Sequence, residues 1–318
     1  MRHSLKKQIR RTRRFDNLDA SENAFLLRQV EQIAARTYDK KYPKLYARKF
    51  VPINGSIDRG AQTYTFARYS QFGMAQLLNA YSDQLPRSDV KVTEESIQIK
   101  GMGASYGYSL QDLRAAMMAN VPLDQKKANA ARRGFELLVD RILAIGDTAT
   151  GMVGMLNQPN ALAYTVPNGA SGVATWADKT PLEILADMVG ICLFIPNSTG
   201  QVEEPNSLIL PRTQYTQIAT TPMFSVGGSD LTILEYFKRN MPQVDVGMWP
   251  KCAGIGANGT DIMMAFDKSP DAFEGVIPQE FEQLPPQQEG LNFTVPCHGR
   301  IGGVVFYYPL SQAIGAGI

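Results

Sequence analysis

The stretch PLDQKKANAARRGFELLVDRILAIG, residues 122–146, predicts one long helix with a defined beginning and end. Its first residue is a proline, which lacks the N–H that a first helical turn leaves unbonded, and its closing glycine tolerates a left-handed conformation. Apolar side chains recur at helical spacing along one face. We expect this face to hold the core residues Phe135, Leu138 and Ile142. At 1.5 Å per residue the helix spans roughly 37 Å, enough to support a whole domain.

Composition excludes several classes of protein. A chain of 318 residues with 44% hydrophobic residues can bury a large core in more than one lobe. The longest apolar run, residues 184–195, is too short to span a membrane and contains Asp187. The basic N-terminus runs into acidic and amide residues instead of an apolar signal segment. We therefore expect no membrane span and synthesis in a cytoplasm.

Cysteine and histidine are too few and too scattered for most catalytic or metal chemistry. Cys192, Cys252 and Cys297 have no pair at metal-ligand spacing, so we interpret them as buried thiols. His298 follows Cys297 directly, but neighbouring residues of a strand point to opposite faces and cannot form a nucleophile and base pair. The sequence therefore predicts no catalytic residue, no metal site and no cofactor.

The N-terminus is strongly basic. Its first 14 residues contain seven positive charges and no acid, while the whole chain has a net charge of only +2. Such a segment is typical of a tail that touches a polyanion or an acidic partner. A solvated tail of no consequence remains the alternative. The predicted DNA- or scaffold-facing residues are Arg2, Lys6, Lys7, Arg10, Arg11, Arg13 and Arg14.

Two long strands are predicted where the apolar period changes to two, at residues 62–68 and 90–99. The segment between them, residues 71–87, is too long for a tight hairpin and unusually apolar for a loop tip. Because a two-stranded arm is marginal alone in water, we expect the tip to contact a neighbouring subunit. Packing of the tip on its own domain is the alternative. The predicted contact residues are Phe72, Met74, Leu77 and Leu78.

Glycines at residues 101, 103 and 107 invite comparison with a dinucleotide-binding fingerprint. Their spacing, G-x-G-x-x-x-G, is one residue too long, and no strand ending in an acid follows at the required distance. Gly107, between two tyrosines, suits instead a strand that passes close to a neighbouring backbone. We therefore predict no nucleotide site here.

Beyond residue 160, helices and strands alternate, as in an α+β or α/β lobe. A capping box, Thr180 to Glu183 with a proline after the cap, begins one helix, and Ser229 or Asp230 is expected to cap another. Strands are expected at residues 207–210 and 262–266, and a strand pair around two glycines at residues 293–308. The buried face expected for the first of these helices is Leu182, Leu185, Ala186, Val189 and Leu193.

Three stretches and the order of these elements resemble a known family. The stretches are DQLPRSDV at residues 83–90, YGYSLQDL at 106–113 and GMVGMLN at 151–157. Together with a basic arm, a long hairpin, a long helix and an inserted lobe, they resemble the major capsid protein of tailed bacteriophages. That family has the Hong Kong 97 fold, which encapsulin nanocompartments share. The resemblance covers nearly the whole chain.

The resemblance implies an α+β fold with five segments. These are an N-terminal arm at residues 1–49, an extended hairpin loop at 50–108 and a peripheral domain with its spine helix at 109–160. An axial domain is inserted at 161–286, and the C-terminal strands of the peripheral domain follow at 287–318. The extended loop would lie over a neighbouring subunit.

The function implied is structural. Copies of the chain would form the pentamers and hexamers of an icosahedral phage head that encloses double-stranded DNA without sequence preference. Because only a short arm precedes the first predicted helix, we expect scaffolding to come from a separate protein or to be dispensable. A portal and a possible decoration protein are expected as further partners. The protein would be assembled in the bacterial cytoplasm and reside in the virion. The alternatives are an encapsulin-like compartment shell and, more distantly, an enzyme that uses the 161–286 lobe.

Overall fold

The computed structural model describes residues 42–72, 88–119, 122–224 and 231–318, and it divides the chain into two units, Met1–Lys44 and Leu45–Ile318. The architecture below is that of the second unit. The seven basic residues of the arm and three of the predicted tip residues, Met74, Leu77 and Leu78, lie outside the described part of the chain.

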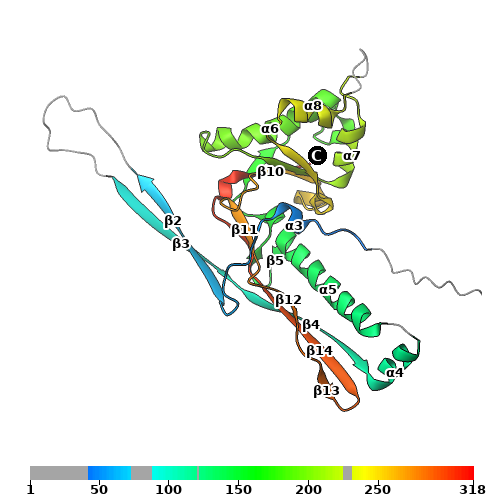
Figure 1. Cartoon of the computed structure of the whole chain (residues 1–318). Helices are drawn as coiled ribbons and strands as arrows, with labels where there is room; N and C mark the ends of the chain where they lie inside the picture. Colours follow the sequence, from blue (N-terminus) through cyan, green and yellow to red (C-terminus); the bar gives the residue numbers. More distant parts are fainter. Residues whose placement is uncertain (1–41, 73–87, 120–121, 225–230) are drawn as a thin grey trace, which may run out of the picture. The chain divides into compact units, whose positions relative to one another are not determined.

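The described residues form helices and strands in a mixed order along the chain (Figure 1). The α-helices are α3 Ala47–Phe50, α4 Leu110–Met118, α5 Leu123–Ile145, α6 Pro181–Thr199, α7 Arg212–Thr220 and α8 Ile233–Asn240. Short 3-10 turns are η1 Met155–Asn157, η2 Trp176–Asp178, η3 Pro250–Cys252, η4 Ala257–Gly259 and η5 Pro309–Ser311. The strands are β1 Ile53–Asn54, β2 Thr63–Phe72, β3 Asp89–Gln98, β4 Lys100–Ser109, β5 Gly146–Asp147, β6 Met152–Val153, β7 Leu162–Thr165, β8 Ser207–Leu210, β9 Asp245–Met248, β10 Ile262–Phe266, β11 Phe273–Val276, β12 Gln279–Gln283, β13 Gln287–Glu289, β14 Asn292–Ile301, β15 Gly303–Phe306 and β16 Gln312–Ala316.

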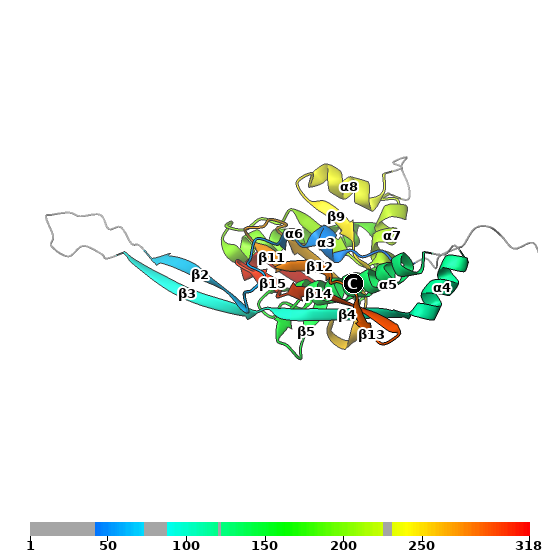
Figure 2. The same ribbon diagram turned by 60° about the horizontal axis from the view of Figure 1, so that its bottom comes forward.

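These strands build sheets with different partners. A five-stranded mixed sheet has the order β7-β16-β10-β8-β9, and a three-stranded sheet has the order β1-β11-β15. A long sheet has β14 at its centre, with β4 on one side and β12 and β13 on the other. The hairpin β2–β3 forms a sheet of its own. In Figures 1 and 2, β3 runs on into β4, so one extended segment serves first the hairpin and then the long sheet.

Helix α5 confirms the long helix predicted from the sequence. The helix begins at Leu123, one residue later than predicted, so Pro122 is its N-cap and not its first helical residue. Gly146 closes the helix with a φ of 78°. Phe135 and Ile142 are buried, whereas Leu138 is 38% exposed. This corrects the expectation for Leu138. The helix packs on β4 and α3, and its core face is therefore displaced from the predicted one toward the buried residues Val139 and Leu143.

Helix α6 begins at the predicted capping box, but the predicted buried face is wrong. Leu182 and Leu193 are 58% and 47% exposed, and the face that packs inward is made of Ile184, Met188, Ile191 and Ile195. Because both faces of the helix are apolar, periodicity could not choose between them. By length and composition, α6 is also the one helix among the described residues that could cross a membrane. Here it packs on the five-stranded sheet instead.

Other boundaries differ from the expectation in ways the backbone explains. Thr232, not Ser229 or Asp230, caps α8, because its side chain and that of Glu235 form a reciprocal capping box. The two late strands β14 and β15 do not pair with each other: Gly303, with a φ of 82°, turns the chain out of the long sheet, and β15 pairs with β11. The predicted core strands at residues 207–210 and 262–266 are confirmed as β8 and β10.

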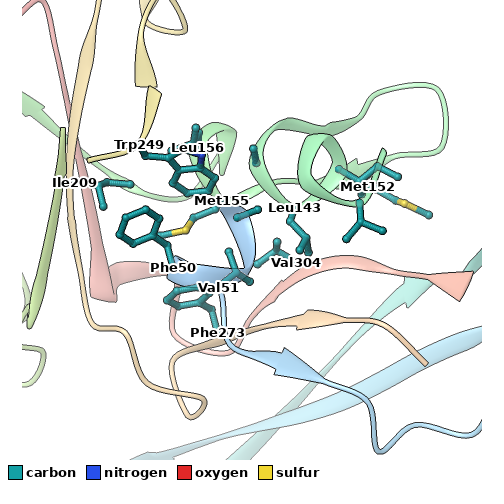
Figure 3. Packing of buried hydrophobic residues seen from close by; sticks show 14 of the residues in the cluster. Phe50, Val51, Leu143, Met152, Met155, Leu156, Ile209, Trp249, Phe273 and Val304 are labelled. Atoms are coloured by element: carbon teal, nitrogen blue, oxygen red, sulfur yellow. The ribbon is translucent and has the colours of Figure 1, made fainter. Parts of the chain in front are cut away.

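Two large cores and a small one hold the unit together. In the first, shown in Figure 3, α5, the three-stranded sheet and the chain around Trp249 meet, and the Phe50 and Trp249 rings stack with centroids 5.3 Å apart. In the second, α6, α7 and α8 cover the five-stranded sheet. The third is a small cluster at the base of the hairpin, built around Ile99, Val276 and Val305. The hairpin therefore joins the unit through its own minor core.

Candidate functional site

No cluster for metal or nucleophilic chemistry is found in the described part of the chain. Those residues contain no group of three or more histidine, cysteine or acidic side chains that could hold a metal ion. The three cysteines are free and buried, as predicted, and burial raises the pKa of the Cys192 thiol to about 12. Cys297 is buried while His298, its neighbour on β14, is only partly so, in line with alternation along a strand. The glycines at residues 101, 103 and 107 lie within strand β4, and not in a loop that could hold a phosphate.

The hairpin β2–β3 is a long and largely exposed element. Its ten residue pairs run from Thr63 opposite Gln98 to Phe72 opposite Asp89. Side chains of directly opposed residues share a face, and Tyr69 lies opposite Val92. These two side chains are 68% and 48% exposed, and Val90, two residues before Val92, is 54% exposed. We name Tyr69, Val90 and Val92 the outer stripe.

The outer stripe is a functional candidate that sequence reasoning missed. The alternation of valines at positions 90 and 92 served as evidence for a strand, but not as evidence that this face would lack a partner within the subunit. Phe72, a predicted contact residue, is the last residue of β2, and the remaining predicted tip residues follow it outside the described part. The outer stripe therefore adds exposed apolar side chains on the two strands to the contact residues predicted from the sequence.

A second feature runs along β2, and Tyr69 of the outer stripe is among the residues that line it. An open groove of about 1270 Å³ separates β2 from the C-terminal end of α6 and from the segment around η5. Its lining is mixed and includes Phe66, Arg68, Val202, Glu203, Tyr308 and Leu310. Burial, followed by the nearby charge of Asp267, raises the pKa of Glu203. The mixture of exposed apolar and acidic side chains suits a protein surface better than a small-molecule site.

A third apolar surface lies at the far end of the long sheet. Helix α4 begins with a reciprocal capping box between Ser109 and Asp112, yet none of its residues is buried. Met117 and Met118 at its end, and Leu291 in the turn between β13 and β14, are largely exposed. A helix of nine residues is marginal alone in water and normally depends on packing against other elements. Helix α4 buries none of its side chains within the subunit, so it lacks most of this stabilisation.

Comparison with known protein families identifies the family of the chain that carries these surfaces. A model of the major capsid protein family, described as "Major capsid protein", matches residues 73–318, more than three quarters of the chain. The chain belongs to the major capsid protein family. This confirms the resemblance noted from the sequence, and it makes the protein a structural subunit that assembles with copies of itself into a capsid shell and is located in the virion.

Solved capsid structures confirm the predicted α+β fold of this capsid protein. The capsid of Myoviridae phage XM1 superposes with a TM-score of 0.80 at 18% identity, covering 92% of this chain and 98% of that one. The capsid of a native GTA particle gives a TM-score of 0.61 at 10% identity, with coverages of 90% and 95%. A virus-like particle from Pyrococcus furiosus gives 0.53 at 14% identity, with coverages of 84% and 90%. No curated protein sequence matches the chain.

Proposed function

We propose that this capsid protein forms the pentamers and hexamers of an icosahedral phage head around double-stranded DNA. The supporting observation is the hairpin: two ten-residue strands with an apolar outer stripe that their own subunit leaves uncovered. Several of the similar solved structures are phage capsids. On this proposal the protein is made and assembled in the host cytoplasm, and it catalyses no reaction.

The outer stripe would be covered by a neighbouring subunit. Burying an apolar side chain of this size stabilises a contact by about 1.5 to 3 kcal/mol. Each contact is modest, but a shell repeats it around every ring, and multivalency raises the stability of the whole above that of any one contact. The predicted tip residues Phe72, Met74, Leu77 and Leu78 stay proposed contacts with a neighbouring copy, separate from the outer stripe.

The five-segment organisation predicted from the sequence is part of the proposal, with one adjustment. Strand β16 pairs antiparallel with β10 and parallel with β7, which places it in the five-stranded sheet of the 161–286 lobe. We therefore assign residues 312–318 to the axial domain and keep 287–311 with the peripheral domain. Within 161–286, strands β11 and β12 pair outside this sheet, β11 with β1 and β15 and β12 with β14.

The basic arm would face the packaged DNA or an acidic scaffolding protein. Neutralising several phosphates or carboxylates by Lys and Arg gives an attraction that weakens steeply with salt. Deleting residues 1–14 should leave a folded subunit with reduced DNA retention or scaffold binding. Unchanged retention across a salt series would contradict this role. A portal and a decoration protein remain expected partners of the same shell.

The test of the proposed contact is a pair of substitutions in the outer stripe, Tyr69→Ser with Val92→Ser. We expect a soluble subunit with the circular dichroism spectrum of the parent that sediments as monomers or small rings, because the hairpin can no longer dock. The matched control, Lys91→Ser with Thr93→Ser, changes the opposite face of the same strand and should assemble. Normal shells from the stripe variant, or equal failure of the control, would overturn the proposed contact.

Electron microscopy of the parent protein checks the remainder of the proposal. A phage head should yield closed shells with five- and six-fold rings and, from infected cells, nuclease-protected DNA. A shell that instead retains an enzyme and no DNA would favour the encapsulin-like alternative.

A further inference from the structure

The hairpin is joined to the subunit at a narrow root. Ile99 is the single residue between β3 and β4, and its backbone N–H donates to the Gln62 carbonyl at 2.8 Å. Its side chain is buried against Val276 and Val305 in the small core, apart from the two large ones. A rotation of the hairpin about its root would therefore disturb this small core and leave the two large cores intact.

A chain of hydrogen bonds crosses this root. Asn54 Nδ2 donates to Glu274 Oε2 at 2.7 Å, and the Tyr307 hydroxyl donates to the same oxygen at 3.1 Å. The hydroxyls of Tyr64 and Tyr307 lie 3.0 Å apart. Since the single proton of Tyr307 is engaged by the carboxylate, Tyr64 is the donor of this last bond. The chain runs from β1 through β11 to the residue after β15, and then to β2 of the hairpin.

Tyr307 also contacts the next two residues on the same face of β2. The Phe66 ring meets the Tyr307 ring edge-on, with centroids 5.0 Å apart and planes at 83°. Arg68 Nη1 donates to the Tyr307 carbonyl at 3.4 Å, and its other terminal nitrogen pairs with Glu95 of β3. Alternation along the strand places residues 64, 66 and 68 on one side. One residue of the body thus contacts three successive inward positions of the hairpin.

We propose that Tyr307 is the positioning residue that sets the angle at which the hairpin leaves the subunit, with Glu274 orienting its hydroxyl. This inference rests on the proposed function, in which the hairpin reaches a neighbouring copy. Apolar contacts in the small core are non-directional, whereas hydrogen bonds have a narrow angular range. The hydroxyl chain, together with the Arg68 bond to the Tyr307 carbonyl, is therefore the directional part of the contact between Tyr307 and the hairpin.

A small change of this angle is magnified along the hairpin. Ten residues of strand span about 33 Å, so a rotation of about 10° at the root moves the far end by about 6 Å. A shift of that size changes where the outer stripe meets its partner, and hence the curvature of the shell. Burial, the Tyr64 hydroxyl and the Glu274 charge all raise the pKa of Tyr307, so it remains a donor throughout the neutral range.

The test is Tyr307→Phe, which removes the hydroxyl and keeps the ring against Phe66. We expect a melting temperature close to that of the parent. Hydrogen exchange of the β2 amides should be about fivefold faster, the factor that one typical net hydrogen bond contributes. Assembly should give shells of mixed diameter, or open shells, in place of one size. Tyr308→Phe, at the exposed neighbouring residue, is the matched control and should leave both readouts unchanged.

Glu274 supplies a rescue experiment. Glu274→Ala removes the shared acceptor and should reproduce the mixed shells, while Glu274→Gln keeps an oxygen at that position and should restore one diameter. Should Tyr307→Phe fail to fold, Tyr64→Phe tests the same chain by removing only its terminal hydroxyl. A single parental diameter in Tyr307→Phe or Tyr64→Phe, unchanged β2 exchange, or an equal effect in Tyr308→Phe overturns the proposal.

This outcome can be told apart from failure of the proposed docking contact. If the outer-stripe variant assembles normally, the hairpin does not dock through that face and the proposed function needs another contact. If the stripe variant fails to assemble while Tyr307→Phe builds shells of the parental diameter, docking stands and only the positioning role is lost.

Discussion

Two antiparallel ladders of equal length meet in this subunit and differ in what covers them. The hairpin pairs β2 with β3 over ten residues, and the long sheet pairs β4 with β14 over ten. Helix α5 packs on the long sheet (Figure 2). There the Phe135 ring lies over Gly299 and meets the Phe281 ring edge-on, with ring centroids 5.4 Å apart. The outer part of the hairpin has no such cover, and β3 is exposed along almost its whole length.

The comparison shows that backbone hydrogen bonds do not decide which strands are stable within the subunit. Both ladders have ten residue pairs, but the long ladder buries side chains such as Met102 and Ile301 in a large core, whereas the hairpin only partly buries a few at its base. A two-stranded ribbon is marginal alone in water, so in the proposed function the hairpin would gain its remaining stability from another copy of the chain. The same polypeptide would then combine a well-packed body with an exposed hairpin that is available to a neighbouring copy. The predictions below test this contrast in order of their expected effect on the isolated subunit.

Removing the cover of the long sheet should have the largest effect. Phe135→Ala deletes a buried ring and should cost about 3 to 5 kcal/mol of unfolding free energy. We expect insoluble or unassembled protein, checked by solubility and by denaturant titration of whatever folds. Normal stability would show that the α5 face does not support the ladder.

Overfilling the same contact should have an intermediate effect. A Cβ on Gly299 would lie 2.2 Å from the Phe135 ring, so Gly299→Ala should cost about 1 to 3 kcal/mol by forcing the ring aside. A Cβ added at Gly103, on the paired strand β4, would have no atom within 4 Å, so Gly103→Ala is the matched control. Thermal melts of the two variants should differ clearly, and equal midpoints would mean that α5 gives way easily.

A surface ion pair on the covered side should have a smaller, pH-dependent effect. Both oxygens of Glu280 accept from Arg48, at 2.8 Å each, and this bonding holds the pKa of Glu280 below its ordinary value of 4.5. A lowered pKa means that the stabilisation is present above pH 4.5 and is lost as the pH falls below it. Exposed pairs contribute about 0 to 1 kcal/mol.

The measurement is the stability difference between the parent and Glu280→Gln as a function of pH. It should be largest near neutral pH and should narrow in acid, while Glu289→Gln on the exposed strand β13 serves as the control. A difference that grows as the pH falls would contradict the assigned direction.

The smallest effect is expected in the hairpin. Tyr69→Ser should change the unfolding free energy of the isolated subunit by no more than about 0.5 kcal/mol, as for other surface positions. Hydrogen exchange of the hairpin amides should slow markedly when the parent assembles and should slow less in this variant. A large loss of stability in the isolated subunit would place Tyr69 in the subunit's own core and remove the contrast between the two ladders.

Periodicity predicted the elements of the fold better than their faces. The long helix was recoverable because its charged and apolar residues separate cleanly and a glycine ends it. Helix α6 was not, because its exposed stripe of Leu182 and Leu193 is as apolar as its buried one, and only the packed structure shows that Asp187 points inward. There Asp187 is paired with Lys179 at 2.5 Å and accepts a bond from Trp176. In the sequence, Asp187 interrupts an apolar face, because its partner Lys179 lies eight residues away and outside the helix.

The functional surfaces were predictable only in part. Alternation at residues 62–68 and 90–99 predicted the two strands of the hairpin. The family resemblance predicted that the hairpin lies over a neighbouring subunit. The root was not predictable, because Tyr64, Glu274 and Tyr307 come from separate strands and no local pattern connects them. A strand was expected at Gly107, but not the full extent of β4, because glycines carry no apolar signal. A Cβ added at Gly107 would lie 3.1 Å from the Phe293 carbonyl oxygen, in line with the predicted close approach to a neighbouring backbone.

The three buried cysteines have a practical consequence. Cys192 is on the buried face of α6, Cys252 lies in the same core as Trp249, and Cys297 is on the central strand of the long sheet. The hairpin contains no cysteine. A thiol reacts with an alkylating reagent only when its surroundings open and expose it as a thiolate. The chain therefore contains three native reporters in three separate regions. Their alkylation rates would time the opening of each region during assembly without any engineered label.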